Sequence, residues 1–225
     1  MNQHKLTGVS HPKRKQVLEL ARSKGLLRPR DVAQFGITPE YLNKLHRDGF
    51  LERVSRGLYR LPNGEPTQHS QLAEVAKRVP RAVVCLISAL NFHDLTTQIP
   101  HQLWLAIPLR DRTPRIEYPP LKILRYSDAS LKYGVEHHIV DSVDVKIFSP
   151  AKSVADCFKF RNQVGLDVAM DALREVWRDK KATADELWIA AKVCRMTNVM
   201  RPYLEAVAFN EEAAGRQAKL PSASL

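Results

Sequence analysis

The sequence contains few cysteines and no long apolar run. The three cysteines, Cys85, Cys157 and Cys194, are odd in number, widely spaced and set among apolar residues, so we expect buried thiols in a reducing compartment. No window approaches the roughly 18 apolar residues that a membrane-spanning helix needs. Residues 1–15 also lack the apolar stretch of a secretory signal. These absences predict a cytoplasmic protein without a membrane partner.

Several signatures of enzymes and metal sites are missing as well. No glycine-rich GxxxxGK[ST] loop leads into Lys152-Ser153, and Ser88 lacks the flanking glycines of a GxSxG nucleophile turn. Four histidines show no ligand spacing with any cysteine, which argues against a zinc site: His93, His101, His137 and His138. We therefore expect no cofactor, no metal site and no catalytic activity.

One pattern keeps a metal-dependent nuclease open as an alternative. Asp141, Asp144 and Lys146 fall on a predicted hairpin, and carboxylates near a lysine can hold Mg²⁺ and activate water. Two acids three residues apart on one strand point to opposite faces, which is awkward for a shared ion. A polar turn explains the same residues equally well, so this short motif remains a hypothesis.

Positive charge is concentrated in the first quarter of the chain. The 225 residues include 35 Lys and Arg against 24 Asp and Glu, a net charge of +11. Residues 1–61 hold 13 of these basic residues against 5 acidic ones, a net of +8, whereas residues 62–225 have a net of +3. A basic region of this kind predicts a polyanionic partner such as nucleic acid.

Three short helices and a hairpin are predicted within this basic region. The expected helices span Lys13–Ser23, Pro29–Phe35 and a third segment that starts after the N-cap Thr38 and ends at Gly49. Phe50–Ser55 and Leu58–Leu61 have the pattern of strands joined by an Arg56-Gly57 turn. Three helices followed by a hairpin is the order of a winged helix-turn-helix domain.

The third helix has one apolar and one polar face. At 100° per residue, Tyr41, Leu42 and Leu45 share one side, and Asn43, Lys44 and Arg47 share the other together with Glu40. The polar face can enter a major groove roughly 12 Å wide, where an amide suits adenine and a guanidinium suits guanine. Basic side chains of the hairpin and of the first helix suit phosphates, which position the protein without specifying sequence. The predicted DNA-binding residues are Lys13, Arg14, Thr38, Asn43, Lys44, Arg47, Arg53, Arg56 and Arg60. A winged helix that docks on a protein partner is the alternative.

A second domain is expected after the polar linker Leu61–Ser70. Predicted strands are Leu103–Ile107, Leu121–Tyr126, and a hairpin of Val135–Val140 with Val143–Phe148 around Asp141-Ser142. Predicted helices are Gln71–Val79, Ser127–Tyr133, Ala151–Phe160, Leu166–Asp179, Ala184–Met196 and Val199–Phe209, with a long apolar run at Ala82–Leu90. Trp104, Trp177 and Trp188 are expected in the core. The expected fold class is α/β (α+β), with a winged helix at 1–63, a mixed domain ending in a helical array at 64–210 and a flexible tail at 211–225.

Four segments together resemble the AbiEi-like antitoxins of type IV toxin–antitoxin and abortive-infection systems. They read GLLRPRDV, GFLERVSRGLYRLP, VVCLISALNFHDLTTQIPHQLWLAIP and VDVKIFSPAKSVADCFKF, and they cover most of residues 25–160. No single motif is diagnostic, but their order across so much of the chain is hard to attribute to coincidence.

The resemblance implies a two-part repressor. It implies a winged helix that binds inverted repeats in the promoter of its own operon, and a larger domain that counteracts a nucleotidyltransferase-type toxin. Members without an adjacent toxin gene also occur, so an orphan regulator stays open. The family offers no catalytic residues, and its DNA-contacting positions correspond here to Asn43, Lys44, Arg47, Arg53 and Arg56.

Overall fold

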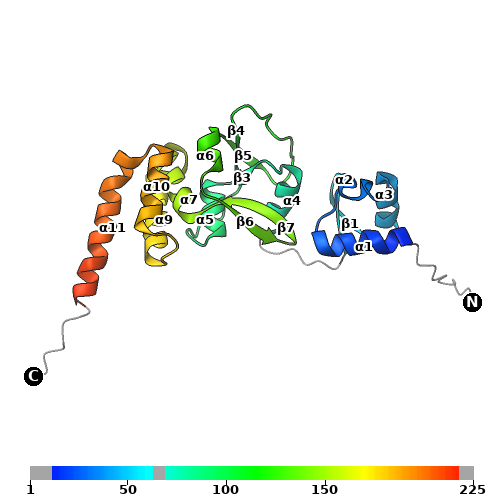
Figure 1. Cartoon of the computed structure of the whole chain (residues 1–225), viewed down its shortest axis with the longest axis horizontal. Helices are drawn as coiled ribbons and strands as arrows, with labels where there is room; N and C mark the ends of the chain where they lie inside the picture. The colour runs from blue at the N-terminus through cyan, green and yellow to red at the C-terminus, as the bar shows by residue number, and fades with distance from the viewer. Residues whose placement is uncertain (1–11, 63–68, 218–225) are drawn as a thin grey trace, which may run out of the picture. The chain divides into compact units, whose positions relative to one another are not determined.

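A computed structural model describes residues 12–62 and 69–217, with side chains up to Ala208. These residues divide into two compact units. The first comprises the described residues up to Pro80 together with His138–Val145, and the second comprises Arg81–His137 and the described residues from Lys146 onward. Figure 1 shows their helices and strands. Six residues of the predicted linker, 63–68, lie outside the described part of the chain. No helix within the described ranges combines the length and apolarity needed to cross a bilayer.

The first unit contains the predicted winged helix. Its helices are α1 (Pro12–Lys24), α2 (Pro29–Ala33) and α3 (Pro39–Arg47), and its hairpin consists of β1 (Glu52–Ser55) and β2 (Leu58–Arg60). The strands are antiparallel, with Ser55 opposite Leu58 and Arg56-Gly57 as the two-residue turn. Gly57 has φ of +70°, a conformation that costs glycine little because it has no Cβ. The expected element order is therefore confirmed.

A short bridge ties the hairpin to the segment between α1 and α2. Leu27 and Tyr59 exchange both backbone hydrogen bonds, with N–O distances of 2.8 and 2.9 Å. Both residues are buried, and they join a core made by one face of each helix. The members of this core are Val17, Ala21, Leu27, Val32, Ile37, Leu42, Leu45, Leu51 and Tyr59. The hairpin of β1 and β2, called the wing from here on, is consequently held against the helices by both backbone and apolar contacts.

The larger sheet is mixed and has five strands. Its strands are β3 (Val83–Val84), β4 (Leu103–Pro108), β5 (Leu121–Tyr126), β6 (Val135–Val140) and β7 (Val143–Phe148), in the order β5-β4-β3-β7-β6. β3 pairs antiparallel to β4 and parallel to β7, while β4 and β5 are parallel. Asp141 and Ser142 both have positive φ, as the tight turn between β6 and β7 requires. The mixed α/β fold class is confirmed.

The apolar run at Ala82–Leu90 divides into two elements. β3 ends at Val84, and α5 (Leu86–Phe92) begins two residues later, with Leu86 in a left-handed conformation at φ of +49°. Both elements are buried, so apolar residues occupy every side of them. The sequence therefore lacks the hydrophobic periodicity that would distinguish a strand from a helix.

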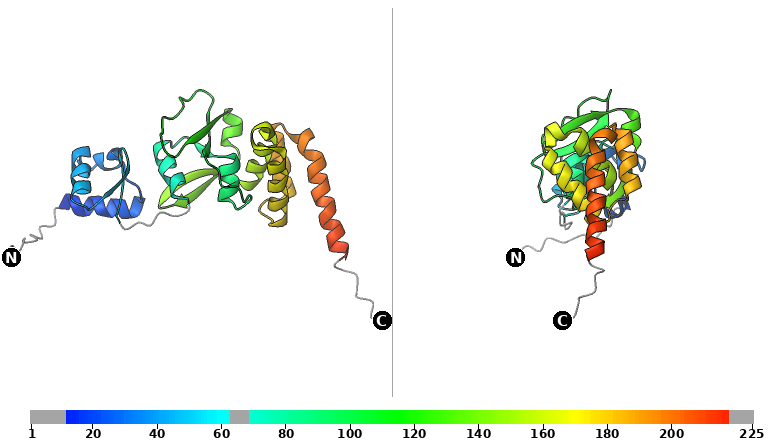
Figure 2. Two further views of the ribbon diagram at one scale, coloured as in Figure 1. Left: turned by 180° about the vertical axis from the view of Figure 1, so that it is seen from behind. Right: turned by 90° about the vertical axis from the view of Figure 1, so that its left-hand side faces the viewer.

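α4 (Ser70–Arg78) belongs to the first unit. A layer of helices belongs to the second unit: α6 (Asp128–Lys132), α7 (Pro150–Lys159), α8 (Arg161–Val164), α9 (Leu166–Arg178), α10 (Ala184–Cys194) and α11 (Thr197–Gln217). α7 packs against α5, α9 and α10, and α11 adds to this layer at the C-terminal end (Figures 1 and 2). The segment expected as a tail contains the last turns of α11, and 218–225 lie outside the described residues.

An ion pair lies inside this helical layer. Lys152 and Asp156 of α7 are fully buried, with Nζ and Oδ2 2.5 Å apart. The Lys152 Nζ also faces the Phe148 ring at 4.3 Å and the Tyr126 ring at 4.9 Å, while Cys194 donates from Sγ to the other Asp156 oxygen at 3.2 Å. The ammonium and the carboxylate therefore have close partners in the core.

The cysteines are buried thiols, as expected. Cys85, Cys157 and Cys194 are free and buried. Burial, with the nearby Asp156 carboxylate as a smaller cause, raises the pKa of Cys194 to about 12. The expectation for the tryptophans is only partly met, because all three are half-buried. Trp104 and Trp177 pack against the core, whereas Trp188 faces Lys192 and Arg201 at 5.9 and 5.7 Å from its ring.

Candidate nucleic-acid interface

Both ends of α3 are defined by local backbone geometry. Thr38 is the N-cap residue and Pro39 occupies the first turn, although the Thr38 hydroxyl makes no capping hydrogen bond to the backbone. At the other end Gly49 has φ of +78°, and the N–H groups of Gly49 and Phe50 donate to the carbonyls of His46 and Leu45 at 3.0 and 2.9 Å. This is the Schellman arrangement, which satisfies the last carbonyls of a helix and turns the chain sharply. The chain passes directly from α3 into the wing.

Most of the predicted DNA-binding side chains are accessible to solvent. Leu42 and Leu45 of α3 are buried, so the opposite face of the helix is free. The exposed members of the predicted set are Lys13, Thr38, Asn43, Lys44, Arg47, Arg53 and Arg56, and Arg14 and Arg60 are half-buried. The polar face of α3 and the tip of the wing are thus both available to a ligand.

Asn43 is linked to the wing by a side-chain hydrogen bond. The Tyr59 hydroxyl of β2 donates to the Asn43 Oδ1 at 2.7 Å. The two Nδ2 hydrogens of the amide stay free to donate, and Oδ1 keeps a second lone pair. This contact fixes the orientation of an exposed amide on α3, and nothing in the spacing of the sequence indicated it.

A basic hollow lies between α1 and α3. Its lining includes Lys13, Arg14 and Lys44, with Asp48 as the acidic member, around a cavity of about 300 Å³. The Arg14 guanidinium sits 4.7 Å from the centre of the Phe50 ring. Such stacking keeps the charge while holding the side chain in place. Three cations from two helices are therefore brought together beside the free face of α3.

The three arginines of the wing are in different environments. Arg60 forms a bidentate ion pair with Glu52 across the hairpin, at 2.8 and 3.2 Å. This hydrogen bonding from Arg60 lowers the pKa of the Glu52 carboxyl. The exposed Arg53 bonds from its Nε to the Ser55 carbonyl at 3.4 Å, and Arg56 lies in the turn. Arg56 and Arg53 are consequently the more available cations, and Arg60 is partly neutralised.

The acidic residues behind the nuclease alternative are spread around the β6–β7 hairpin. Asp141 is half-buried in the turn, and Asp144 is exposed on β7 two residues before Lys146. Neither aspartate belongs to the histidine-containing cluster found among the described residues. The sequence pattern therefore corresponds to a turn and a strand face.

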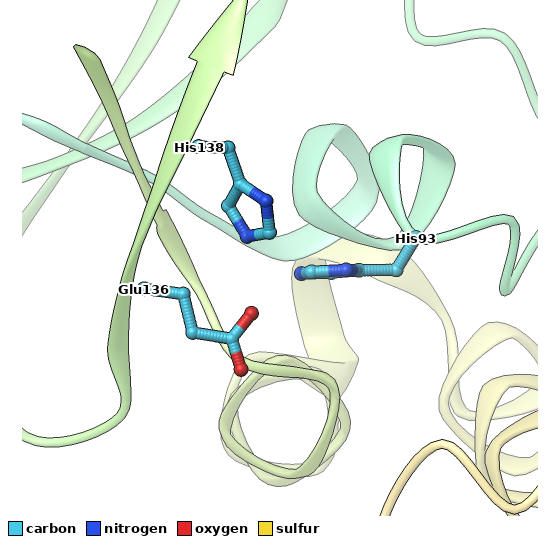
Figure 3. Close-up of side chains that lie close together, drawn as sticks. All are labelled: His93, Glu136 and His138. Atoms are coloured by element: carbon cyan, nitrogen blue, oxygen red, sulfur yellow. The ribbon is translucent and has the colours of Figure 1, made fainter.

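That cluster consists of His93, Glu136 and His138, shown in Figure 3. One potential ligand atom from each lies within 4.8 Å of the others, and all three side chains are half-buried. The spacing of the histidines from the cysteines does not reveal this cluster, because His93 and β6 are more than 40 residues apart and meet through the fold. The alternation Glu136-His137-His138 was the one local signal.

The N-terminal part of the chain is similar to a known protein family. Residues 15–62 match the family model of the AbiEi antitoxin transcriptional regulators. The AbiEi match spans most of α1, then α2, α3 and the wing, and includes two of the four resembling segments. It ends before α4.

Most of the chain is similar in fold to a solved structure with low sequence identity. The crystal structure of the RV2827C protein from Mycobacterium tuberculosis aligns with a TM-score of 0.54 and 14% identity, covering 87% of this chain and 81% of that one. This likeness concerns the fold alone. No curated protein matches the sequence.

Proposed function

We propose that this protein is a sequence-specific DNA-binding transcriptional repressor. The observation that carries the proposal is the free polar face of α3, with Asn43, Lys44 and Arg47 exposed beside a basic wing, within a segment that matches the AbiEi regulators. A helix with this face fits the width of the major groove, and the adjacent wing fits the flanking backbone.

The residues divide into two roles. Arg47 and Asn43 read base edges, the first through two guanidinium donors to guanine and the second through its amide to adenine. Lys13, Arg14 and Lys44 of the basic hollow contact phosphates, as do Arg53 and Arg56 of the wing, and Thr38 contacts the backbone at the start of α3. Arg60 contributes least, because Glu52 already occupies its guanidinium.

The first test measures whether the protein binds the DNA that lies upstream of the reading frame encoding it. The full chain is titrated into labelled upstream fragments and into a shuffled fragment of equal composition, and anisotropy is followed. We expect tighter binding to an upstream fragment containing an inverted repeat, and footprinting should protect that repeat. Equal affinity for the upstream and shuffled fragments would mean that the protein does not bind DNA sequence-specifically.

We further propose that the protein is an antitoxin that represses its own promoter and counteracts a nucleotidyltransferase-type toxin. The AbiEi match supports this role. The test is co-expression with a nucleotidyltransferase encoded next to this gene. We expect the chain to restore growth in cells expressing that toxin. An Arg47→Ala, Arg56→Ala double variant should also restore growth if residues 69–217 carry the antitoxic function. DNA binding without rescue would leave an orphan regulator.

A further inference from the structure

Strand β6 presents two potential metal ligands on one side. Side chains alternate along a strand, so Glu136 and His138 point the same way while His137 and Ile139 point the opposite way. The burial pattern agrees, since Glu136 and His138 are half-buried and His137 and Ile139 are exposed. Figure 3 shows the Glu136 and His138 side chains directed toward the end of α5.

His93 completes the group from the C-terminal end of α5. Both backbone polar groups of His93 are hydrogen-bonded. The His93 N–H donates to the Ala89 carbonyl at 3.0 Å, and the His93 carbonyl accepts from the Lys181 Nζ at 2.5 Å. The following residue, Asp94, has φ of +53°, which turns the chain away from the helix. The imidazole is thereby held facing β6, as Figure 3 shows.

The His93 ring is held by a hydrogen bond to the backbone. Nε2 lies 2.8 Å from the Phe148 carbonyl, which can only accept, so Nε2 is the donor and Nδ1 is the ring nitrogen that a metal would use. A ligating histidine usually donates its other N–H to a carbonyl or carboxylate, which fixes the tautomer and the ring orientation. His93 has this supporting bond in place.

We infer that His93, Glu136 and His138 form a binding site for a divalent transition metal of the zinc class. Two imidazoles and one carboxylate suit Zn²⁺ and similar first-row ions better than Mg²⁺ or Ca²⁺, which prefer oxygen ligands. The ligand atoms lie within 4.8 Å of one another. Small side-chain rotations bring them to the separation of about 3.4 Å that bond lengths near 2.1 Å imply for a tetrahedral site. Three protein ligands leave one position for water or a further ligand.

The test is metal binding by the full chain without an affinity tag. Metal is removed with a chelator, Zn²⁺ is titrated calorimetrically, and Co²⁺ is added separately so that its visible absorption reports the ligand geometry. We expect one Zn²⁺ per chain and the absorption of a four-coordinate Co²⁺ site, with no binding of Mg²⁺ at the same concentrations. Failure of the wild-type chain to take up stoichiometric Zn²⁺ would refute the site.

Matched variants separate this site from binding at other histidines. Glu136→Gln keeps the shape of the side chain and should weaken Zn²⁺ binding at least tenfold, and His138→Asn should abolish stoichiometric binding. His137→Asn, on the opposite side of the same strand, should bind as the wild type does. Circular dichroism establishes that each variant is folded before titration. Equal affinities of His138→Asn and His137→Asn would overturn the inference.

Discussion

Arg47 and Arg56 are exposed arginines that differ in what they can reach on DNA. Arg47 projects from the free face of α3, whereas Arg56 lies in the turn of the wing. We expect Arg47→Ala to weaken binding to the operator by about 1–3 kcal/mol and to relax the base preference at one position. Competition binding with single-base operator variants measures both effects.

Arg56→Ala is the matched control for that substitution. Because a phosphate contact carries no base information, the variant should weaken binding to operator and shuffled DNA by the same factor. A change in base preference in Arg56→Ala, or unchanged operator binding in Arg47→Ala, would contradict the assignment of α3 as the reading helix.

Tyr59 offers a test of how Asn43 is positioned. Tyr59→Phe removes the hydroxyl that donates to Asn43 but preserves the ring in the core. We expect a loss of about 0.5–1.5 kcal/mol in the free energy of unfolding, and weaker discrimination for adenine because the amide can rotate. Urea denaturation gives the first quantity and operator variants give the second. If adenine discrimination persisted, the hydrogen bond would have no part in recognition.

At the scale of elements, α7 depends on its buried ion pair. Asp156→Ala leaves the Lys152 ammonium without its carboxylate in a region closed to solvent. We expect a loss of about 3–5 kcal/mol in the free energy of unfolding. Lys152→Met combined with Asp156→Leu should be much less damaging, since it leaves no buried charge. Urea denaturation of the two variants makes the comparison, and equal losses would mean that packing dominates at this position.

The start of α10 provides a prediction with a defined pH dependence. Thr183 and Glu186 form a capping box, with Glu186 N–H donating to the Thr183 Oγ1 at 3.2 Å and Thr183 N–H donating to the Glu186 carboxylate at 2.8 Å. The Thr183 N–H, followed by its hydroxyl, lowers the pKa of the Glu186 carboxyl. Thr183→Ala should cost about 1 kcal/mol at neutral pH.

The Glu186 part of this cap should disappear in acid. A carboxyl whose pKa is lower in the folded state contributes stability above the unfolded pKa of about 4.3, and loses it as the pH falls through the folded value. The stability difference between wild type and Glu186→Gln should therefore be present at pH 7 and shrink below about pH 4. Denaturation curves at several pH values measure it, and a constant difference would exclude the carboxylate as its source.

Local signals predicted elements well where a cap or turn accompanied them. Asp141-Ser142 and Arg56-Gly57 place both hairpin turns correctly, and the predicted helix at Ala184–Met196 begins at the first residue of α10. The division of Ala82–Leu90 into β3 and α5 could not be predicted, because a segment buried on all sides has no period. The parallel pairing of Val84 with Ile147 and the approach of His93 to His138 join distant segments, which spacing along the chain cannot reveal.

For the whole molecule, charge makes DNA affinity dependent on salt. Five basic side chains are proposed to contact phosphates: Lys13, Arg14, Lys44, Arg53 and Arg56. Each releases close to one counterion, so a plot of log K against log salt should have a slope of about −4.5. Anisotropy titrations of the full chain between 50 and 200 mM salt give this slope. A slope near zero would favour the winged helix as a module that docks on a protein.

The Tyr59–Asn43 contact has a consequence for how such a protein could acquire a new operator. Residue 43 is anchored by residue 59, whose ring also belongs to the core of the first unit. A substitution of Asn43 that altered base choice would leave the Tyr59 hydroxyl without its acceptor. A substitution of Tyr59 would disturb the packing of the core. Retargeting would thus proceed through compensated pairs, and related proteins with different operators should covary at these two positions.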